Sequence, residues 1–385
     1  MAVSDWPAGK VSHRNFAGRG GKEHFLSIRS PALPSFREQL AFVEDAYRRS
    51  LRDLGLSSSS SVFRRVFVSD ILNQGGLVKS SSLTDELTAT SIVQQPPLPD
   101  AKIELLAYHI DVGAPLSKRR LDPAHLLFEH NGQRHLWSTG LCAGDDCGAS
   151  TTEEQTDGVF KSLVATLHRD AATLKENCVR TWIYLKDVDV FYRPMVAARK
   201  RLFAEQGMTE STHYIASTGI EGACGHPFDL VAMDAYSQLD LKPGQMSYLD
   251  DFERLCPTKN YNVTFERGTR IDYADRSHLF ISGTASIDAQ GQVVHPGDVL
   301  RQAGHALDNV EALLHSGGAK LADLMYLIVY LRDRTDFGKV NDFLRSRLAD
   351  IPIFVVQGSV CRPAWLIELE GVAIKPNHAP HFPAF

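Results

Sequence analysis

The sequence predicts an α+β protein of three fused units, each a β-sheet with two helices on one face, which together form an intramolecular pseudo-trimer. Three observations lead to this prediction. The chain has 385 residues, more than one ordinary hydrophobic core accommodates. Its 43% hydrophobic and 23% charged residues are typical of a globular protein. The same succession of strand-like and helix-like segments also occurs more than once along the chain.

Two copies of this succession are clear in the second and third parts of the chain. Each copy starts with a β-rich run that enters a turn, continues with a helical pattern, and then has a strand-like run that ends in a basic residue and Asp. A second helical pattern and two closing strands complete it. The paired segments are 134–146 and 277–289, 156–174 and 297–314, 178–187 and 324–333, 191–207 and 337–351, 213–222 and 353–362, and 228–237 and 365–374.

A fainter third copy occupies the first hundred residues. Its segments match the opening strand, the first helix, the strand that ends in Asp and the closing strand; they are 23–28, 35–55, 63–70 and 101–110. The Ser-rich runs 56–61 and 79–91 predict loosened connections. We therefore expect a mobile tail over 1–22 and units over 23–115, 116–250 and 251–385, with three like sheets packed around an axis.

Composition excludes several classes of function. A formal charge of -5 provides no basic field for nucleic acid. No apolar run approaches the roughly 18–20 residues that cross a bilayer, and the N-terminus lacks the apolar core of a secretion signal. Six cysteines in so long a chain favour a reducing cytoplasm over a disulfide framework. The run "CAGDDC" (142–147) has too few ligands for a zinc site, so we expect no metal.

Two carboxylates lie on the last predicted strand, "WLIELEGVAI" (365–374). Side chains of a strand alternate between its faces, so Glu368 and Glu370 share one face. A carboxylate on an apolar strand is costly unless it is partnered, hydrated or used. We expect Glu370 to pair with a nearby base. For Glu368 two interpretations are open: a catalytic acid, or a residue that caps a buried hydrogen-bond network.

Several motifs resemble those of a known family. "LFISGTASID", "VYLRDRTDF" and "IELEGVAI" resemble the YjgF/RidA family, whose small members trimerise with a ligand site at each interface. Together with "RHLWSTG", "VRTWIYL", "IASTGIEG" and "VCRPAWLIELEG", they make most of residues 23–375 similar to the chorismatases of the FkbO kind. The resemblance is strongest after about residue 130 and implies three fused YjgF/RidA-like units.

The resemblance implies an enzyme that cleaves chorismate and releases pyruvate without a cofactor. Glu368 matches the family's glutamate, which protonates the methylene carbon of the enol ether; water or a substrate hydroxyl then captures the cation. Cys361 matches a cysteine of the hydroxybenzoate-forming branch. Ala274 is aligned with a position that varies between Gly and Ala, and it resembles the branch that forms a dihydroxycyclohexadiene carboxylate. We predict 3-hydroxybenzoate, with the diene acid or a mixture of 3- and 4-hydroxybenzoate as alternatives.

Departures from simpler relatives limit the other functions. RidA deaminases have an Arg in the penultimate strand, where our alignment has Ile353 in the third copy and His213 in the second, which argues against deamination. At the position of Glu368 the first copy has Glu104 and the second has Ala232. We therefore expect one good site, where the third unit meets the second. A ligand-binding module without turnover is the alternative from another class.

Candidate substrate-binding residues follow from the two carboxylates of chorismate. Guanidinium groups suit carboxylates, so Arg180 in "VRTWIYL" is the first candidate and Arg199 the second, although a helical Arg beside Lys and Arg is usually solvated. Tyr214, Thr218 and Gly219 in "HYIASTGIEG" could supply a hydroxyl and backbone N–H groups. We expect a monomer, since one chain supplies all three units.

Overall fold

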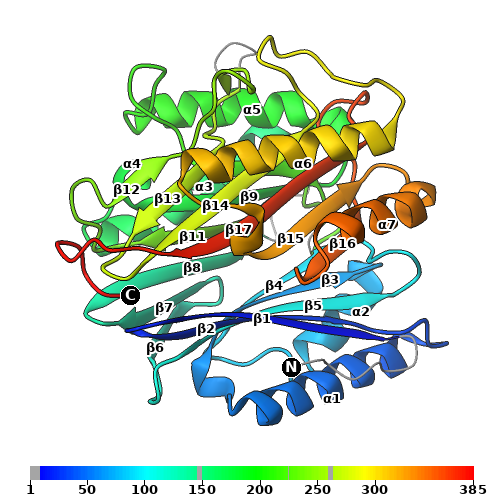
Figure 1. Ribbon diagram of the computed structural model, residues 1–385, viewed down its shortest axis with the longest axis vertical. Coiled ribbons are helices and arrows are strands. Elements are labelled where there is room, and N and C mark those ends of the chain that lie inside the picture. Colours follow the sequence, from blue (N-terminus) through cyan, green and yellow to red (C-terminus); the bar gives the residue numbers. More distant parts are fainter. Residues whose placement is uncertain (1–8, 145–149, 224, 259–262) are drawn as a thin grey trace.

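The computed structural model describes residues 9–144, 150–223, 225–258 and 263–385. It has three β-sheets with helices on their outer faces (Figure 1), which confirms the predicted α+β class with three fused units. The strand orders are β1-β2-β5-β3-β4, β10-β9-β11-β8-β7-β6 and β12-β13-β14-β17-β15-β16. In each sheet, the closing strand lies between the opening hairpin and the strand that ends in Asp.

The first unit supplies the five-stranded sheet. Its elements are β1 (Lys10–Gly18), β2 (Gly21–Arg29), α1 (Phe36–Leu54), the 3-10 helix η1 (Ser58–Ser60), β3 (Ser61–Val68), α2 (Ile71–Lys79), β4 (Ala89–Gln94) and β5 (Ile103–Asp111). The expected mobile tail over 1–22 is wrong for its second half. Residues 10–18 pair with β2 in an antiparallel hairpin, from Lys10 opposite Arg29 to Gly18 opposite Gly21. The mixed polar sequence of β1 hid a strand that its ladder holds at the sheet edge.

The second unit supplies the second sheet. Its elements are β6 (Ser117–Asp122), β7 (His125–His130), β8 (Gln133–Leu141), α3 (Thr152–Arg169), α4 (Leu174–Asn177), β9 (Cys178–Leu185), α5 (Val188–Glu205), β10 (Ala216–Glu221) and β11 (Val231–Gln238). Both long helices have side-chain N-caps. Thr151 and Glu154 form a capping box at α3, and Asp187 accepts the backbone N–H of Val190 at α5.

The third unit supplies the third sheet. Its elements are β12 (Met246–Tyr248), β13 (Gly268–Asp272), β14 (Arg276–Ala285), α6 (Val299–Ser316), η4 (Leu321–Asp323), β15 (Leu324–Leu331), η5 (Arg334–Asp336), α7 (Phe337–Arg347), β16 (Ile353–Gln357) and β17 (Ile367–Pro376). Because β12 pairs with β13, the expected boundary at 250/251 is too late. The second and third sheets separate between Gln238 and Met246.

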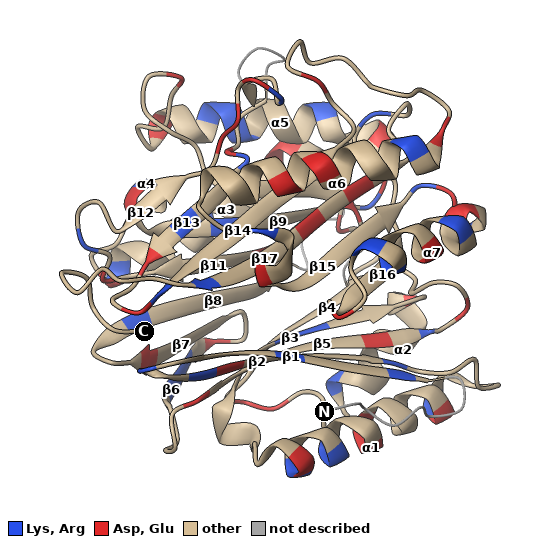
Figure 2. Cartoon of the chain, viewed as in Figure 1, with Lys and Arg blue, Asp and Glu red and all other residues tan. Residues whose placement is uncertain are grey.

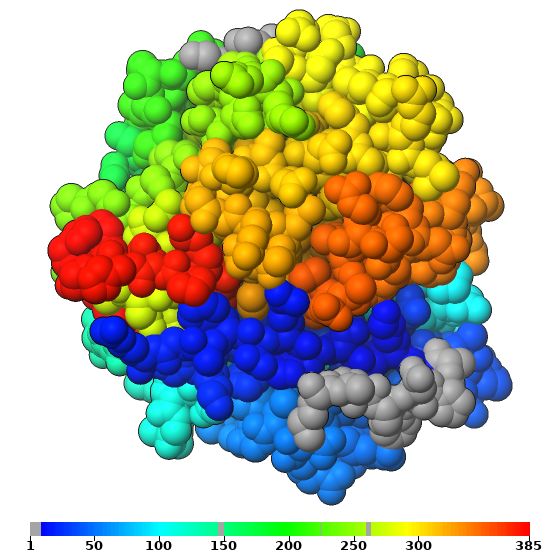
Figure 3. Space-filling model, viewed as in Figure 1, coloured from blue at the N-terminus to red at the C-terminus, as the bar shows by residue number. Residues whose placement is uncertain are grey.

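The inner faces of the sheets form a shared core. Three aromatic pairs each join two units: Phe63 with Trp137, Tyr236 with Phe280, and Phe25 with Tyr326, at ring-centroid distances of 4.1, 5.5 and 5.8 Å. In the space-filling view the blue first unit lies below the orange third unit (Figure 3). Each sheet is covered by helices on one face and by the neighbouring sheets on the other. Because both faces are buried, individual strands have continuous apolar sequences.

Charged side chains also meet at the centre. Arg65 of β3 donates to Asp234 of β11 at 3.2 Å and lies 3.7 Å from Glu370 of β17. All three are buried. The guanidinium of Arg65 also stacks over the Trp182 ring at 4.6 Å. One cation from the first unit therefore lies between carboxylates of the other two units, so each of these buried charges has a neighbour of opposite sign.

Strand register tests the alignment of the three copies. Glu104, Ala232 and Glu368 are aligned with one another on the three closing strands. Each pairs with a residue at the same position of the neighbouring strand, in the pairs Glu104–Phe67, Ala232–Tyr184 and Glu368–Tyr330. This confirms their equivalence. The alignment of His213 with Ile353 is wrong: Ile353 pairs with Leu327, and the matching ladder position pairs Ser217 with Thr181. A turn of different length before β10 displaced the alignment.

Two expectations concern membranes and metals. Among the helices of the described residues, none is long and apolar enough to cross a bilayer. The run 142–147 falls partly outside the described residues, so its second cysteine is not placed. Within the described ranges no three His, Cys, Asp or Glu side chains gather as metal ligands.

Candidate active site

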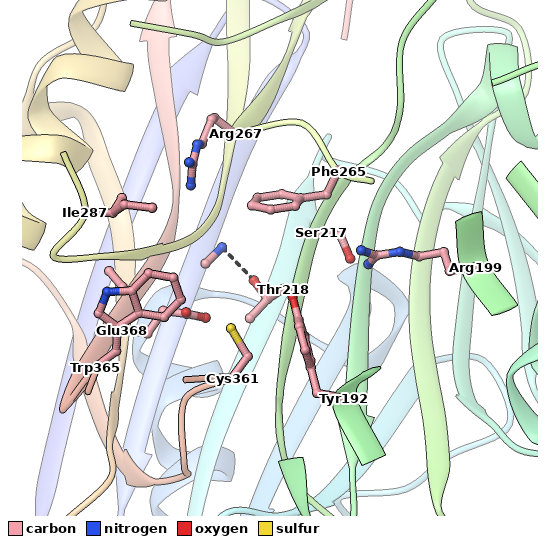
Figure 4. A pocket seen from close by; sticks show the side chains of 13 residues that line it. Tyr192, Arg199, Ser217, Thr218, Phe265, Arg267, Ile287, Cys361, Trp365 and Glu368 are labelled. Atoms are coloured by element: carbon pink, nitrogen blue, oxygen red, sulfur yellow. Dashed lines mark hydrogen bonds between the residues drawn. The ribbon is translucent and has the colours of Figure 1, made fainter. Parts of the chain in front are cut away.

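A pocket lies where the third unit meets the second (Figure 4). Residues of α5 and β10 form the side from the second unit, and the third unit contributes β14, β17 and the segments before β13 and before β17. Its polar lining comprises Tyr192, Arg199, Ser217, Thr218, Arg267, Cys361 and Glu368. Phe265, Ile287 and Trp365 supply much of the apolar lining.

Glu368 reaches this pocket from β17. Its side chain is buried, and burial together with the negative charge of Glu370 raises its pKa to about 8, against the opposing effect of Arg180 and Arg267. The carboxyl is therefore protonated at neutral pH. An acid that holds its proton near the working pH can donate it to a substrate.

Gly283 makes room for this carboxyl. The β14–β17 ladder is irregular between Ile281 and Thr284, and this irregularity brings Gly283 against Glu368. A Cβ at position 283 would lie 2.8 Å from the carboxyl carbon of Glu368, closer than real Cβ contacts come. Any side chain there would force the carboxyl to move. Only the packing of β14 against β17 reveals this contact between Gly283 and Glu368.

Glu370 lies behind the pocket wall and accepts hydrogen bonds from two units. Arg180 donates at 2.7 Å, the Trp182 indole at 2.9 Å and the Tyr330 hydroxyl at 3.0 Å, and the Thr218 hydroxyl also donates. All four of these hydrogen bonds have Glu370 as the acceptor, the role that suits a carboxylate. The expectation that Glu370 pairs with a nearby base is confirmed.

Arg180, the first candidate for a substrate carboxylate, does not line the pocket. Its guanidinium donates to Glu370, to Thr218 at 2.5 Å and to the carbonyls of Thr181 and Ile281 at 2.9 and 3.3 Å. The reasoning that an Arg on an apolar strand needs a partner was right. The partner is a protein carboxylate, because Glu370 points to the same buried side.

Two other arginines line the pocket from its two sides (Figure 4). Arg199 of α5 is buried; its Nε donates to the Thr264 hydroxyl at 3.1 Å, and its buried Nη2 has no partner within the described residues. It is not on a solvated helix face. Arg267, which sequence reasoning missed, donates to the Cys256 carbonyl at 2.9 Å and lies over the Phe265 ring.

The strand β10 forms one wall. Thr218 and Gly219 line the pocket as expected, and the Thr218 hydroxyl accepts the backbone N–H of Gly283 at 2.8 Å, which ties the two units together (Figure 4). Tyr214 does not line the pocket: it is buried against Phe203, because it precedes the strand and faces the helices. The phenol in the pocket is that of Tyr192 from α5.

Cys361 lines the pocket beside Glu368. Burial, reinforced by the Glu368 charge, raises the pKa of its thiol to about 12, so the group stays a neutral thiol. Ala274, in contrast, lies outside the pocket in the turn before β14, where its N–H donates to the Pro383 carbonyl at 2.9 Å. Ala274 is nine positions before Gly283 in the chain, a span of about 30 Å in extended backbone. Ala274 is therefore not part of the pocket lining.

An outer groove adjoins the pocket and shares Tyr192, Cys361 and Trp365 with it. Basic residues of α5, Arg193 and Lys200 among them, line this groove, and the blue segments of α5 are visible in Figure 2. Basic side chains outnumber acidic ones in this groove, where Asp189 is the one acidic residue among its described lining.

Comparisons with known proteins identify the family to which the chain belongs. The family model described as Endoribonuclease L-PSP matches residues 270–375. A RutC family protein of Pyrococcus abyssi is 31% identical over 99 residues, which are 25% of this chain and 78% of that protein. The chain therefore belongs to the RutC family, the Endoribonuclease L-PSP or YjgF/RidA-like proteins.

The whole chain has a more particular likeness. A chorismatase of Streptomyces hygroscopicus is 29% identical over 210 residues (50% of this chain, 60% of that protein). A 3-hydroxybenzoate synthase of the same organism is 28% identical over 277 residues (65% and 76%). A crystal structure of chorismatase matches with a TM-score of 0.62 at 19% identity over 82% of this chain and 93% of that chain. The fused three-unit fold is thus that of chorismatase, and the predicted resemblance is confirmed.

Proposed function

We propose that the chain is a chorismatase, which cleaves the enolpyruvyl ether of chorismate to pyruvate and 3-hydroxybenzoate. One observation carries the proposal: a single interface pocket combines a protonated carboxyl, Glu368, with two buried guanidinium groups, Arg199 and Arg267. Two cations match the two carboxylates of the substrate. The likeness to a chorismatase and to a 3-hydroxybenzoate synthase supports the same reaction.

Glu368 acts as the general acid. It gives its proton to the methylene carbon of the enol ether, and the electron pair of the double bond forms the new C–H bond, which leaves an oxocarbenium ion beside the Glu368 carboxylate. The new carboxylate stabilises this cation in the buried site.

The ring hydroxyl captures this cation and its proton returns to Glu368. The ring then loses the C–H proton at the ether carbon and breaks the C–O bond of the former hydroxyl, which makes it aromatic. The resulting alkoxide forms the keto group of pyruvate and expels the phenolate oxygen, which takes up the proton, so the two products contain all the atoms of the substrate. Capture by water would give the diene acid and consume one water.

The residues around Glu368 are the reason for proposing hydroxybenzoate as the product. Cys361 places a neutral thiol beside Glu368. On β14 the small residue that lies against the acid is Gly283, not Ala274. If Gly283 is the family position that varies between Gly and Ala, then Cys361 and Gly283 both favour the hydroxybenzoate branch. The two residues that distinguish the branches then no longer disagree. Hydrolysis to the diene acid is the second candidate, supported by the outer groove, which adjoins the acid through Cys361 and Trp365.

The test is direct. Purified protein is incubated with chorismate, pyruvate is measured with a coupled dehydrogenase, and the ring product is identified by chromatography, with Glu368→Gln alongside. We expect pyruvate with 3-hydroxybenzoate, lost in the variant. The diene acid instead would keep the chorismatase and overturn the branch. No pyruvate would assign the chain to the ligand-binding class.

Further features of the organisation belong to this proposal. The unit boundaries fall at 115/116, between the end of β5 and the start of β6, and between Gln238 and Met246. A monomer suffices, because both sides of the pocket come from one chain. A reducing compartment such as the cytoplasm suits the free thiols of Cys178, Cys256 and Cys361.

A further inference from the structure

We propose that Glu370 is a positioning residue: it holds Arg180 and Thr218 behind the pocket wall, and its charge keeps Glu368 in the acid form. This inference rests on the proposed function, because the acid form matters only if Glu368 donates a proton. Glu370 does not line the pocket itself, and it contacts the lining through the Thr218 hydroxyl. Its influence passes through its charge and its hydrogen bonds.

The geometry makes Glu370 the junction of the interface. It lies two residues from Glu368 on the same face of β17, opposite Ile328 of β15. Arg180 and Trp182 from the second unit and Tyr330 from the third unit donate to its two oxygens. All of these side chains are buried. Few alternatives to this arrangement exist, since each donor would otherwise be left unsatisfied in the core.

Thr218 connects this junction to the acid. Its hydroxyl donates to Glu370 and accepts from Arg180 and from the backbone N–H of Gly283. Gly283 in turn lies against the Glu368 carboxyl. With its one proton given to Glu370, Thr218 presents only its lone pairs to Gly283, which fixes the segment that the acid rests on.

The charges around Glu368 come from several elements. Glu370 of β17 is the negative neighbour that favours the protonated acid; Arg180 of β9 and Arg267 before β13 favour the carboxylate. Arg199 and Tyr192 on α5 and Cys361 before β17 also line the pocket. Behind Glu370, Arg65 lies 3.7 Å away and is shared with Asp234. Glu370 therefore acts twice: it repels a second negative charge, and it neutralises Arg180.

This dual action predicts opposite effects for the two partners. Glu370→Gln removes a negative charge and leaves Arg180 uncompensated, so Glu368 should lose its proton about one pH unit or more below its wild-type value. Arg180→Met removes the positive charge and should shift the same titration upward. A purely structural pair would give shifts of one sign, because both variants break the same hydrogen bond.

The experiment follows the carboxyl band of Glu368 in infrared difference spectra against pH, assigned by its loss in Glu368→Gln. Wild type should keep the band up to about pH 8. Tyr330→Phe, which removes a neutral donor from Glu370 and no charge, is the matched control and should titrate like wild type. The pH dependence of kcat/KM for pyruvate release should move in the same directions. If Glu370→Gln does not fold, the upward shift in Arg180→Met carries the test.

Shifts of the same sign in both charge variants, or no shift, would overturn the proposal. The infrared readout needs no turnover, so the two proposals fail separately. Opposite shifts without pyruvate release from wild type would retain the electrostatic role of Glu370 and overturn the chorismatase assignment. Pyruvate release with unshifted titrations would do the reverse.

Discussion

The interface that contains Glu368 and the interface that contains Glu104 share a backbone plan and differ in what surrounds the acid. Glu104 is equivalent to Glu368 on the closing strand, is equally buried, and has a pKa that burial raises to about 7. Each acid also has an arginine from the neighbouring unit. Arg199 lies twelve residues after Asp187, and Arg345 twelve after Asp333.

The differences lie opposite the two acids. Glu368 faces Ala285 across the β14–β17 ladder, whereas Glu104 faces Arg29 across the β2–β5 ladder. Arg29 is anchored to the Leu98 carbonyl at 2.7 Å, and its charge, with those of Arg345 and Lys10, lowers the pKa of Glu104 against the effect of burial. A large cation thus stands where the Glu368 site has a methyl group.

The two equivalent arginines, Arg199 and Arg345, also differ in their hydrogen-bond partners. Arg345 donates to the carbonyls of Ile351 and Ile353 at 3.0 and 3.4 Å, so it ties α7 to the segment that leads into β16. Arg199 keeps a buried Nη2 that no described residue accepts. At the third interface the equivalent positions are Ala232 and Ser82. An acid and an arginine at equivalent positions are therefore insufficient for a site. The site also needs small residues opposite the acid and an arginine whose N–H groups are not all used by the protein.

The largest expected effect separates the two glutamates. Glu368→Gln should lower kcat for pyruvate release by about 100- to 10,000-fold, the usual worth of a general acid. Glu104→Gln, the matched substitution at the other interface, should keep kcat and KM within about twofold, since Glu104 contacts no part of the pocket. Steady-state kinetics at pH 7 measure both. Equal losses in the two variants would show that the interfaces work together.

The next effect comes from crowding the acid. Gly283→Ala should lower kcat by about 100-fold, because displacing a reacting group by about 1 Å costs that much. Gly338→Ala on α7 is the control: its new Cβ meets nothing within 4 Å and should slightly stabilise the helix. Unchanged turnover in Gly283→Ala would mean that the acid has room to move.

The arginines give a smaller, KM-centred effect. Arg199→Met should raise KM for chorismate about 10- to 100-fold through loss of a charge-assisted hydrogen bond. Arg345→Met, at the equivalent helix position, should leave KM unchanged and lower the melting temperature instead. A raised KM in Arg345→Met would point to a second site for the substrate near Glu104.

The smallest effect is on stability. Folding raises the pKa of both carboxyl groups from about 4.5, to about 8 for Glu368 and about 7 for Glu104. The contribution of such a group to folding stability is fully present below the unfolded-state pKa and is lost as the pH rises through the folded-state pKa. Glu368→Gln and Glu104→Gln should therefore match wild type near pH 4.5 and exceed it above pH 8.

The gain should be a few kcal/mol, larger for Glu368, since one unit of pKa difference is worth about 1.4 kcal/mol. Denaturant unfolding at the two pH values measures it. A variant less stable than wild type at pH 8.5 would indicate that the carboxylate form has a partner in the folded protein.

Much of the site was predictable residue by residue. Glu368 and Cys361 on the closing segment, Thr218 and Gly219 on β10, and Arg199 on α5 all line one pocket. Each stood in a motif whose strand or helix was readable from local patterning. Arg180, Tyr214 and Ala274 lie outside the pocket lining, and the sequence did not show which side chains turn toward the pocket. That depends on partners elsewhere in the chain.

The sequence by itself determined the three-unit repeat, the strand that carries Glu368 and the inequality of the three interfaces, because periodic burial and residue identity are local properties. Only the tertiary structure decided that Glu370 takes Arg180, that Gly283 and Arg267 border the acid, and that Arg29 faces Glu104. These contacts join residues that are far apart in the chain, from 75 positions for Arg29 and Glu104 to 190 for Arg180 and Glu370. Their proximity is set by how the sheets pack around one another, which no single segment encodes.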